Sequence, residues 1–194
     1  MTAIIIKGRS GSNNNNLPST LLSGLVSCFN TQLTPGSGSF SVQPPSPFNT
    51  AYNIGTYAIS FITNTSASVQ DICCASAGEF PRIFIGSNGR ITSYFVGTSP
   101  FFDRGIESIP INSGSKNVYI LVINNTTIQH QLNGNSTVNS SFQTGTTRSI
   151  NMNSSYRLGG YIDGTNLFQG SYYFFGFWNR ALTSNEMAIL NTIL

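Results

Sequence analysis

The acidic residues are the first candidates for chemistry, because glycoside hydrolysis needs two carboxyl groups that act together. In a retaining enzyme these groups lie about 5 Å apart, one as the acid and one as the nucleophile. The nearest acidic pair here is Asp103 and Glu107, and an Arg-Gly break lies between them. The other acids are isolated in the sequence: Asp71, Glu79, Asp163 and Glu186. This pattern predicts a protein that is not an enzyme.

The single histidine and the cysteines add no catalytic or metal-binding pattern. His130 lies between two glutamines in an alternating stretch, residues 127–132, so we expect a solvent-facing strand residue. No G-x-S-x-G motif supplies a nucleophile that His130 could activate. Cys28, Cys73 and Cys74 are expected to be buried reduced thiols, because no spaced second pair accompanies them as in a zinc site. We therefore predict no catalytic residue, no metal and no cofactor.

Residues 170–178 (GSYYFFGFW) carry the most informative aromatic pattern. Successive side chains of a strand point to opposite faces, so two aromatic sets result. These sets are Tyr173, Phe175 and Phe177 on one face, and Tyr172, Phe174 and Trp178 on the other. One set fills the core, and the second is covered either by a C-terminal helix or by a neighbouring subunit or ligand. Because aromatic residues suit protein interfaces and sugar stacking, Tyr172, Phe174 and Trp178 are the candidate interface or glycan residues.

The composition narrows the class of protein. The chain has 194 residues, of which 8% are charged, 39% are hydrophobic and 12% are aromatic. A charged fraction this low is well under the usual quarter and excludes a coiled coil and a disordered polyelectrolyte. A net charge of +3 is too weak to neutralise many phosphates, so no nucleic-acid partner is expected. The longest apolar runs are too short to cross a bilayer, so no membrane contact is expected.

Strand and turn signals recur about every ten residues from residue 56 onward. Asn88-Gly89 between two β-branched runs is a strong hairpin signal, because both residues tolerate positive φ. Thr183 and Glu186 are spaced as a capping box, which predicts a short helix over residues 187–194. The expected strands include residues 56–62, 68–74, 82–86, 90–96, 116–124, 127–132, 137–142 and 170–178. The pattern predicts an all-β, two-sheet antiparallel jelly-roll sandwich with a short C-terminal helix.

The N-terminal 20 residues read as an arm and linker that precede one domain, residues 21–194. Ile4, Ile5 and Ile6 are too apolar to remain in water, and the Gly/Ser/Asn tract that follows cannot hold them. We expect these isoleucines to contact another chain, with addition to the protein's own sheet as the alternative. The start of the chain lacks the apolar core of a secretory signal, so synthesis in a cytoplasm without that export route is expected.

Three motifs near the C-terminus together resemble a known family. They are residues 156–160 (YRLGG), 168–171 (FQGS) and 177–183 (FWNRALT). They resemble the closing motif of laminin-G-like domains, which belong to the concanavalin-A-like lectin and glucanase jelly rolls. Upstream, residues 57–63 and 116–134 are similar to a strand and a hairpin of that family. The resemblance implies a two-sheet antiparallel sandwich, used in that family for glycan binding, cell adhesion or accessory roles.

The chain also departs from this family pattern. The acidic pair of the closing motif falls on Tyr173 and Phe174, which weakens the transfer of function. Family calcium sites use carboxylates and carbonyls, and calcium takes six to eight oxygen ligands. Asp163-Gly164 could contribute ligands to such a calcium site, but a β-turn is the preferred interpretation there.

A second resemblance lies at the N-terminus. Residues 4–10 (IIIKGRS), 17–24 (LPSTLLSG) and 30–31 are similar to the opening of phage tail-fibre and virion-appendage proteins. This resemblance implies a non-enzymatic structural protein of a phage virion, as capsid decoration or as a component of a tail or head fibre. Its partners would be other virion proteins, further copies of itself and host surface glycan. The alternative is a secreted or cell-surface carbohydrate-binding or adhesion module located outside the cell.

Overall fold

A computed structural model describes most of the domain. The described residues are 17–29, 40–42, 51–52, 54–64, 68–75, 82–96, 102–104, 110–124, 127–141, 150–151, 156–161 and 164–194. Ile4, Ile5 and Ile6 of the expected arm lie outside these ranges, as do Glu79, Glu107 and Asp163. The Cys28 side chain lies outside the described part as well.

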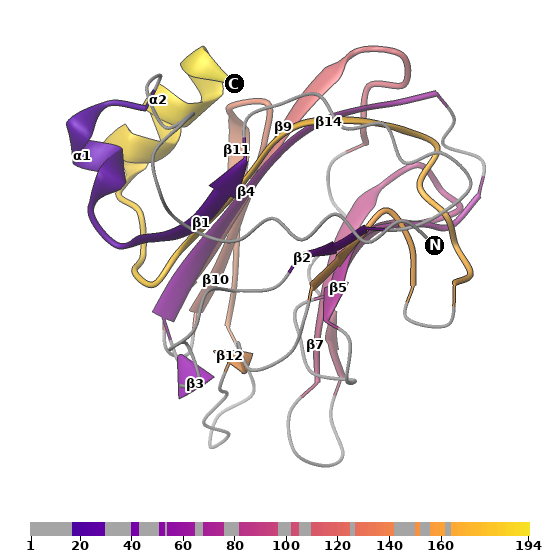
Figure 1. Ribbon diagram of the computed structural model, residues 1–194, viewed down its shortest axis with the longest axis horizontal. Helices are drawn as coiled ribbons and strands as arrows, with labels where there is room; N and C mark the ends of the chain where they lie inside the picture. Colours follow the sequence, from indigo (N-terminus) through magenta and orange to yellow (C-terminus); the bar gives the residue numbers. More distant parts are fainter. Residues whose placement is uncertain are drawn as a thin grey trace.

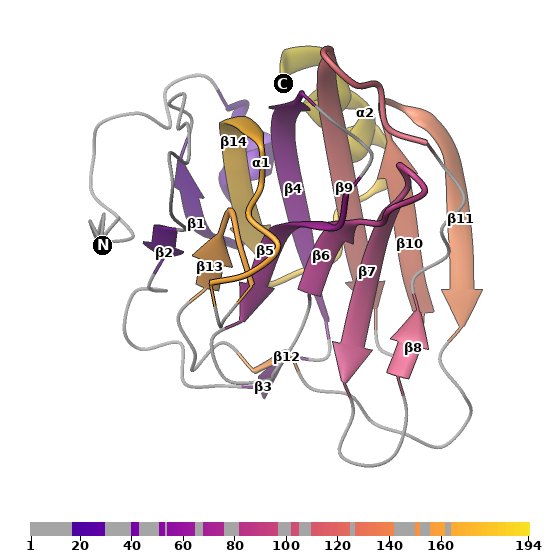
Figure 2. The same cartoon turned by 90° about the vertical axis from the view of Figure 1, so that its right-hand side faces the viewer.

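Two six-stranded antiparallel sheets face each other, as the sequence predicts (Figures 1 and 2). The first sheet has the order β1 (Leu25–Phe29), β14 (Gly170–Trp178), β4 (Ile54–Thr63), β9 (Lys116–Asn124), β10 (Thr127–Leu132) and β11 (Asn135–Ser141). The second has the order β2 (Phe40–Val42), β13 (Tyr156–Leu158), β5 (Gln70–Ala75), β6 (Arg82–Ile85), β7 (Ile91–Val96) and β8 (Phe102–Arg104). A small pair joins β3 (Ala51–Tyr52) and β12 (Ile150–Asn151).

Tight turns at the expected residues set the hairpin registers. Gly89 has a φ of 71°, and its N–H donates to the Gly86 carbonyl at 2.9 Å in the turn between β6 and β7. Asn133 and Gly134 have φ values of 53° and 70° between β10 and β11. Two successive residues with positive φ form the turn whose twist matches that of a hairpin, which explains the Asn-Gly pair.

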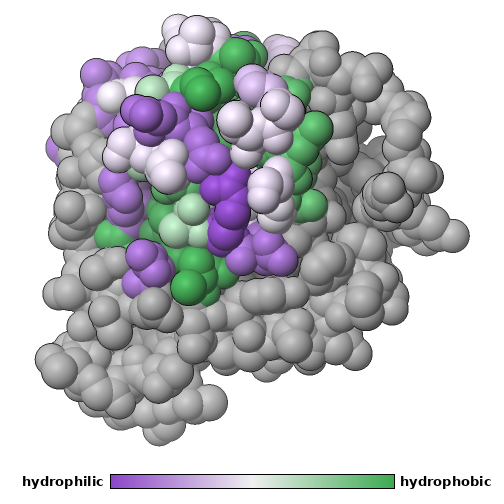
Figure 3. All heavy atoms as spheres, turned by 90° about the vertical axis from the view of Figure 1, so that its left-hand side faces the viewer, coloured by the Kyte–Doolittle hydropathy of each residue, from purple (hydrophilic) through white to green (hydrophobic). Residues whose placement is uncertain are grey.

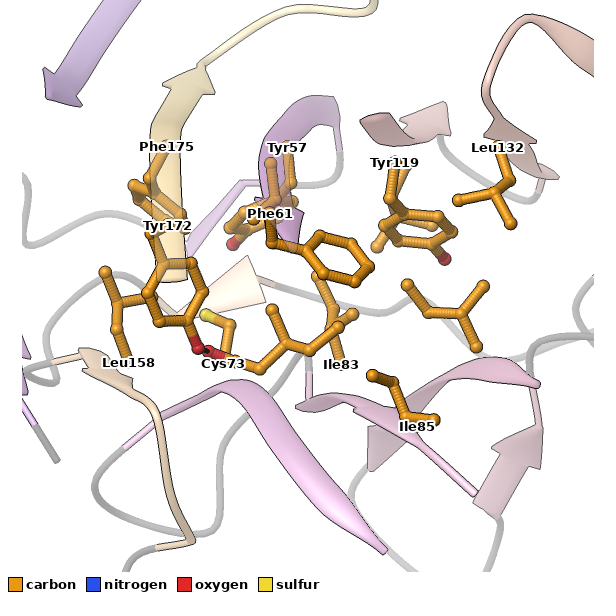
Figure 4. Close-up of a cluster of buried hydrophobic side chains, with 14 of the residues drawn as sticks. Tyr57, Phe61, Cys73, Ile83, Ile85, Tyr119, Leu132, Leu158, Tyr172 and Phe175 are labelled. Atoms are coloured by element: carbon orange, nitrogen blue, oxygen red, sulfur yellow. Dashed lines mark hydrogen bonds between the residues drawn. The ribbon is translucent and has the colours of Figure 1, made fainter. Parts of the chain in front are cut away.

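The main core fills the space between the two sheets (Figure 4). Aromatic residues from the first sheet, among them Tyr57, Phe61 and Tyr172, meet aliphatic residues from the second, such as Ile83 and Ile85. The Tyr172 hydroxyl donates to the Ile72 carbonyl at 2.7 Å, so this buried polar group is satisfied. Burial in this core raises the pKa of the Cys73 thiol well above its usual value, as expected for an inert reduced cysteine.

A second core lies on the opposite face of the first sheet, under the C-terminal helix α2 (Ser184–Ile193). Thr183 and Glu186 form the predicted capping box at the start of α2. Met187 and Leu190 of the helix pack with Phe174 and Trp178 of β14. Helix α2 therefore covers the outer aromatic residues of β14, which is one of the two outcomes that the sequence left open.

The expected alternation along β14 is wrong at one point, because a β-bulge shifts its register between Tyr172 and Phe174. Tyr172 therefore shares the inter-sheet core with Phe175 and Phe177, while Phe174 and Trp178 face the helix. Tyr173 is the extra residue of the bulge and is half-buried, with the Lys116 ammonium 5.9 Å from the centre of its ring. A bulge adds one residue without a partner, so strict alternation fails beyond it.

The segment before β1 packs against the domain, and this packing begins before residue 21, the boundary expected from the sequence. The one-turn helix α1 (Ser19–Leu22) places Leu21 in the second core, and the Trp178 indole N–H donates to the Leu21 carbonyl at 2.7 Å. Arg180 binds the Thr20 carbonyl through Nη2 at 3.0 Å and both carboxylate oxygens of Glu186. Arg180 thus joins α1 to α2.

The surface over the two helices mixes hydrophilic and hydrophobic residues (Figure 3). Leu22 and Ile193 are its exposed large apolar side chains among the described residues, with 44% and 42% exposure. Neither helix in the described ranges is long and apolar enough to cross a membrane.

His130 is buried, with 5% exposure, so the expectation of a solvent-facing residue is wrong. Its Nδ1 lies 2.5 Å from the Tyr119 hydroxyl. Its Nε2 has no hydrogen-bond partner among the residues that the structure describes. Burial lowers the pKa of His130 to about 4, because the charged imidazolium loses its hydration inside the sandwich.

The buried histidine predicts a loss of stability in mild acid. Between pH 6.5 and 4 the unfolded chain binds a proton at His130 that the folded chain does not, so unfolding becomes easier as pH falls. The free energy of unfolding should drop by up to about 3 kcal/mol over this range. Urea unfolding of the wild type and of His130→Gln at pH 7, 5.5 and 4 checks this. The variant should lose less stability, and an equal loss in both proteins would contradict the assignment.

Candidate functional site

The sequence candidates on β14 are all inside the protein. Tyr172 and Trp178 are fully buried, and Phe174 is 2% exposed. None of the three offers a ring face to a ligand in this structure. A candidate site must therefore be sought on the other sheet, whose outer face carries charged and aromatic side chains in its centre.

One row of side chains crosses the outer face of this second sheet. On β6, Ile83 and Ile85 point into the main core, so Arg82 and Phe84 point outward. Phe84 lies directly opposite Asp71 of β5 and Thr92 of β7. Directly opposite residues of antiparallel strands share a face, which places these three side chains in a row. Figure 2 looks onto this sheet.

Arg82 is held in place by Asp71, a fully buried carboxylate. The guanidinium donates from Nε to Oδ1 and from Nη2 to Oδ2, the latter at 2.8 Å. Such a two-point contact fixes both the position and the plane of the guanidinium. Burial disfavours the charge on Arg82, but the hydrogen bonds and charge of Asp71 outweigh it, and the pKa of Arg82 is raised. The Arg82 side chain keeps 22% exposure, whereas the Asp71 side chain has none.

Two aromatic rings flank the Arg82 guanidinium. Its central carbon lies 4.4 Å from the centre of the Tyr161 ring and 4.7 Å from that of Phe84. Phe84 is nearly buried, whereas Tyr161 is half-buried. A cation over a ring face is attracted by the negative charge density of the ring, which adds to the hold of Asp71.

The segment that carries Tyr161 is anchored by backbone hydrogen bonds. The Gly164 N–H donates to the Tyr161 carbonyl at 3.0 Å, and the Tyr161 N–H to the Thr165 carbonyl at 2.9 Å. The Asp71 N–H donates to the Asn166 carbonyl at 2.8 Å, which ties this turn to β5. The turn expected at residues 163–164 includes Asp163, which lies outside the described residues.

Two further polar features distinguish this surface. Arg82 Nη1 has no hydrogen-bond partner among the described residues. The Thr92 hydroxyl is buried in the same row, and it too has no partner in the part of the chain that the structure describes. We name the group of Asp71, Arg82, Phe84, Thr92 and Tyr161 the Arg82 site.

Two of the remaining acidic candidates have described side chains, and each is paired with an arginine. Glu186 is engaged by Arg180, which lowers its pKa to about 2, and Asp71 is engaged by Arg82. In the described ranges no three His, Cys, Asp or Glu side chains gather as metal ligands would.

The Arg82 site was missed by sequence reasoning, although one signal for it was present. The alternation Arg-Ile-Phe-Ile over residues 82–85 places a cation and an aromatic ring on one face of a strand. Nothing in the sequence places Asp71 opposite Phe84, because that pairing depends on a bulge between Asp71 and Cys73.

No family model matches the chain, and a search of curated proteins finds no match. Solved structures do share its fold. A Ruminococcus gnavus intramolecular trans-sialidase CBM40 with bound α2,3-sialyllactose is 17% identical, with a TM-score of 0.65, over 87% of this chain and 99% of that one. NanB sialidase from Streptococcus pneumoniae is 14% identical, with a TM-score of 0.66, over 85% of this chain and 28% of that one. The binding domain of botulinum neurotoxin serotype D is 10% identical, with a TM-score of 0.64, over 83% and 42%.

These similarities establish the β-sandwich architecture and no more, since the identities are low. The chain spans about a quarter of the sialidase that it resembles and nearly all of the CBM40 module. Its extent is therefore that of a single sandwich module.

Removing Arg82 should destabilise the fold more than removing Arg180. Arg82→Met keeps the side-chain length between the rings but leaves the buried Asp71 carboxylate without its cation, which costs about 3–5 kcal/mol. Arg180→Met breaks a similar two-point pair, but Glu186 retains access to water, so a smaller loss is expected. Urea unfolding of both variants at pH 7 measures the difference. Equal losses would show that Asp71 does not depend on Arg82.

Proposed function

We propose that this chain is a non-catalytic glycan-binding module and that the Arg82 site is its binding surface. The observation that carries this proposal is an arginine that Asp71 holds at two points over two aromatic rings, with 22% exposure of its side chain and no partner for its Nη1 among the described residues. Sugars offer hydroxyl oxygens to such donors and apolar C–H faces to aromatic rings. A site that is rigid before the ligand arrives loses little entropy on binding.

Similarity to other modules supports the glycan-binding role over the virion role that the N-terminal resemblance implies. The Ruminococcus gnavus CBM40, a module of nearly the same extent, is known with bound α2,3-sialyllactose and with bound α2,6-sialyllactose. We therefore favour the alternative of a secreted or cell-surface carbohydrate-binding module, with surface glycans outside the cell as partners. Membership of the laminin-G-like family remains a prediction from the closing motif.

The positions of the acidic groups support a non-catalytic role. Hydrolysis needs one carboxyl group as acid and a second as nucleophile or base. Among the residues with described side chains, Asp71 and Glu186 are each held by an arginine through two oxygens. Neither is positioned to exchange protons with a sugar. Binding without turnover is thus the activity that this surface favours.

Replacing Tyr161 should weaken glycan binding without unfolding the protein. Tyr161→Ala removes a half-buried ring from the Arg82 site, and we expect at least a tenfold rise in Kd, which equals about 1.4 kcal/mol. A glycan array identifies the ligand, and isothermal titration of the wild type and the variant measures Kd.

Tyr173→Ala is the matched control for this test. Tyr173 is also a half-buried tyrosine near a cation, but it belongs to the first sheet. Its replacement should leave Kd within about twofold of the wild type, since it removes no group from the Arg82 site. If both substitutions weaken glycan binding equally, or if Tyr161→Ala does not weaken it, the binding surface lies elsewhere on the protein.

A further inference from the structure

The contact of Arg82 with Asp71 limits what else Arg82 can bind. A guanidinium has five N–H groups, and Asp71 takes one from Nε and one from Nη2. The two N–H groups of Nη1 and one of Nη2 remain, and one from each nitrogen lies along the terminal edge of the guanidinium. This edge can still form two parallel N–H···O hydrogen bonds with a pair of neighbouring oxygens.

The positive charge of Arg82 is already balanced by the carboxylate of Asp71. Asp71 is fully buried and cannot move away from Arg82 into water. The faces of the Tyr161 and Phe84 rings, which carry partial negative charge, lie against the guanidinium. A carboxylate on the free edge of Arg82 would meet a neutral ion pair and the repulsion of Asp71 behind it. Sugar hydroxyls accept hydrogen bonds from the same edge without that repulsion.

We propose that the Arg82 site selects uncharged glycans, with two adjacent sugar hydroxyls on the free edge of Arg82, and discriminates against carboxylated ones. This inference rests on the proposed function and deepens it by assigning the ligand class. It separates this chain from the modules of the same fold whose structures contain sialyllactose. The buried carboxylate of Asp71 is the element that determines the selectivity.

The test compares neutral ligands with counterparts that carry an acidic sugar. Isothermal titration of the wild type with lactose and with α2,3-sialyllactose, and with a neutral oligosaccharide from the array and its uronic-acid counterpart, gives Kd for each pair. The neutral member should bind at least tenfold more tightly. Its Kd should change little between 50 and 500 mM salt, because no net charge is involved.

Asp71→Asn tests the origin of the selectivity. Asparagine keeps the size of the side chain and one oxygen for Arg82 but removes the negative charge, so the site becomes cationic. The preference for neutral over acidic ligands should fall at least tenfold, and binding of the acidic ligand should weaken with salt. Circular dichroism and a thermal melt verify that the variant is folded. If it does not fold, the wild-type ligand pairs and their salt dependence decide the question alone.

Glu186→Gln is the matched control. It removes the carboxylate of the other two-point arginine pair and changes the net charge of the protein by the same amount. Its ligand preference should equal that of the wild type. A wild type that binds acidic glycans more tightly, or a folded Asp71→Asn variant with an unchanged preference, would overturn this inference. A wild type that binds no glycan, or binding unaffected by Tyr161→Ala, would instead overturn the proposed function.

Discussion

The burial of β14 on both faces is the constraint on which the rest of the structure depends. Its aromatic side chains enter the inter-sheet core on one side and the core beneath α2 on the other. A strand in a one-sided sheet alternates apolar and polar residues, whereas β14 is apolar on both sides and must be covered twice. The bulge at Tyr173 makes this possible, since it directs Tyr172 and Phe175 to the same core. The capping box of α2 and the Arg180 contacts then hold the helix over the second face.

The burial of both faces of the first sheet explains why the candidate site lies on the second sheet. The outer face of the first sheet is occupied by α1 and α2, and its aromatic residues stabilise the fold (Figure 1). The second sheet presents a cation, its buried carboxylate and two rings on its own outer face.

Local signals allowed much of the fold to be predicted from the sequence. Asn-Gly turns, β-branched runs and a capping box each depend on residues within a few positions of one another, and all three were found as expected. The features that were not predicted from the sequence have one cause in common. The bulges in β14 and β5 and the burial of His130 depend on what distant strands place opposite a residue. The Arg82 site could not be predicted for the same reason, because 11 positions separate Asp71 from Arg82 and only strand pairing brings them together.

The Asp71–Arg82 and Glu186–Arg180 pairs show how burial changes the role of an arginine–carboxylate ion pair. Glu186 retains access to water and lies beside Arg180 on the helix surface, where the pair joins two segments of the chain. Asp71 has no exposure, so it depends on Arg82 for compensation of its charge, and Arg82 is in turn fixed in the sheet. A surface pair can separate and re-form at little cost, whereas a pair with one buried member cannot. The same rigidity that makes the Asp71–Arg82 pair costly to disrupt orients the unused N–H edge of Arg82. The fixed geometry of the Arg82 site follows from the requirement to compensate one buried carboxylate.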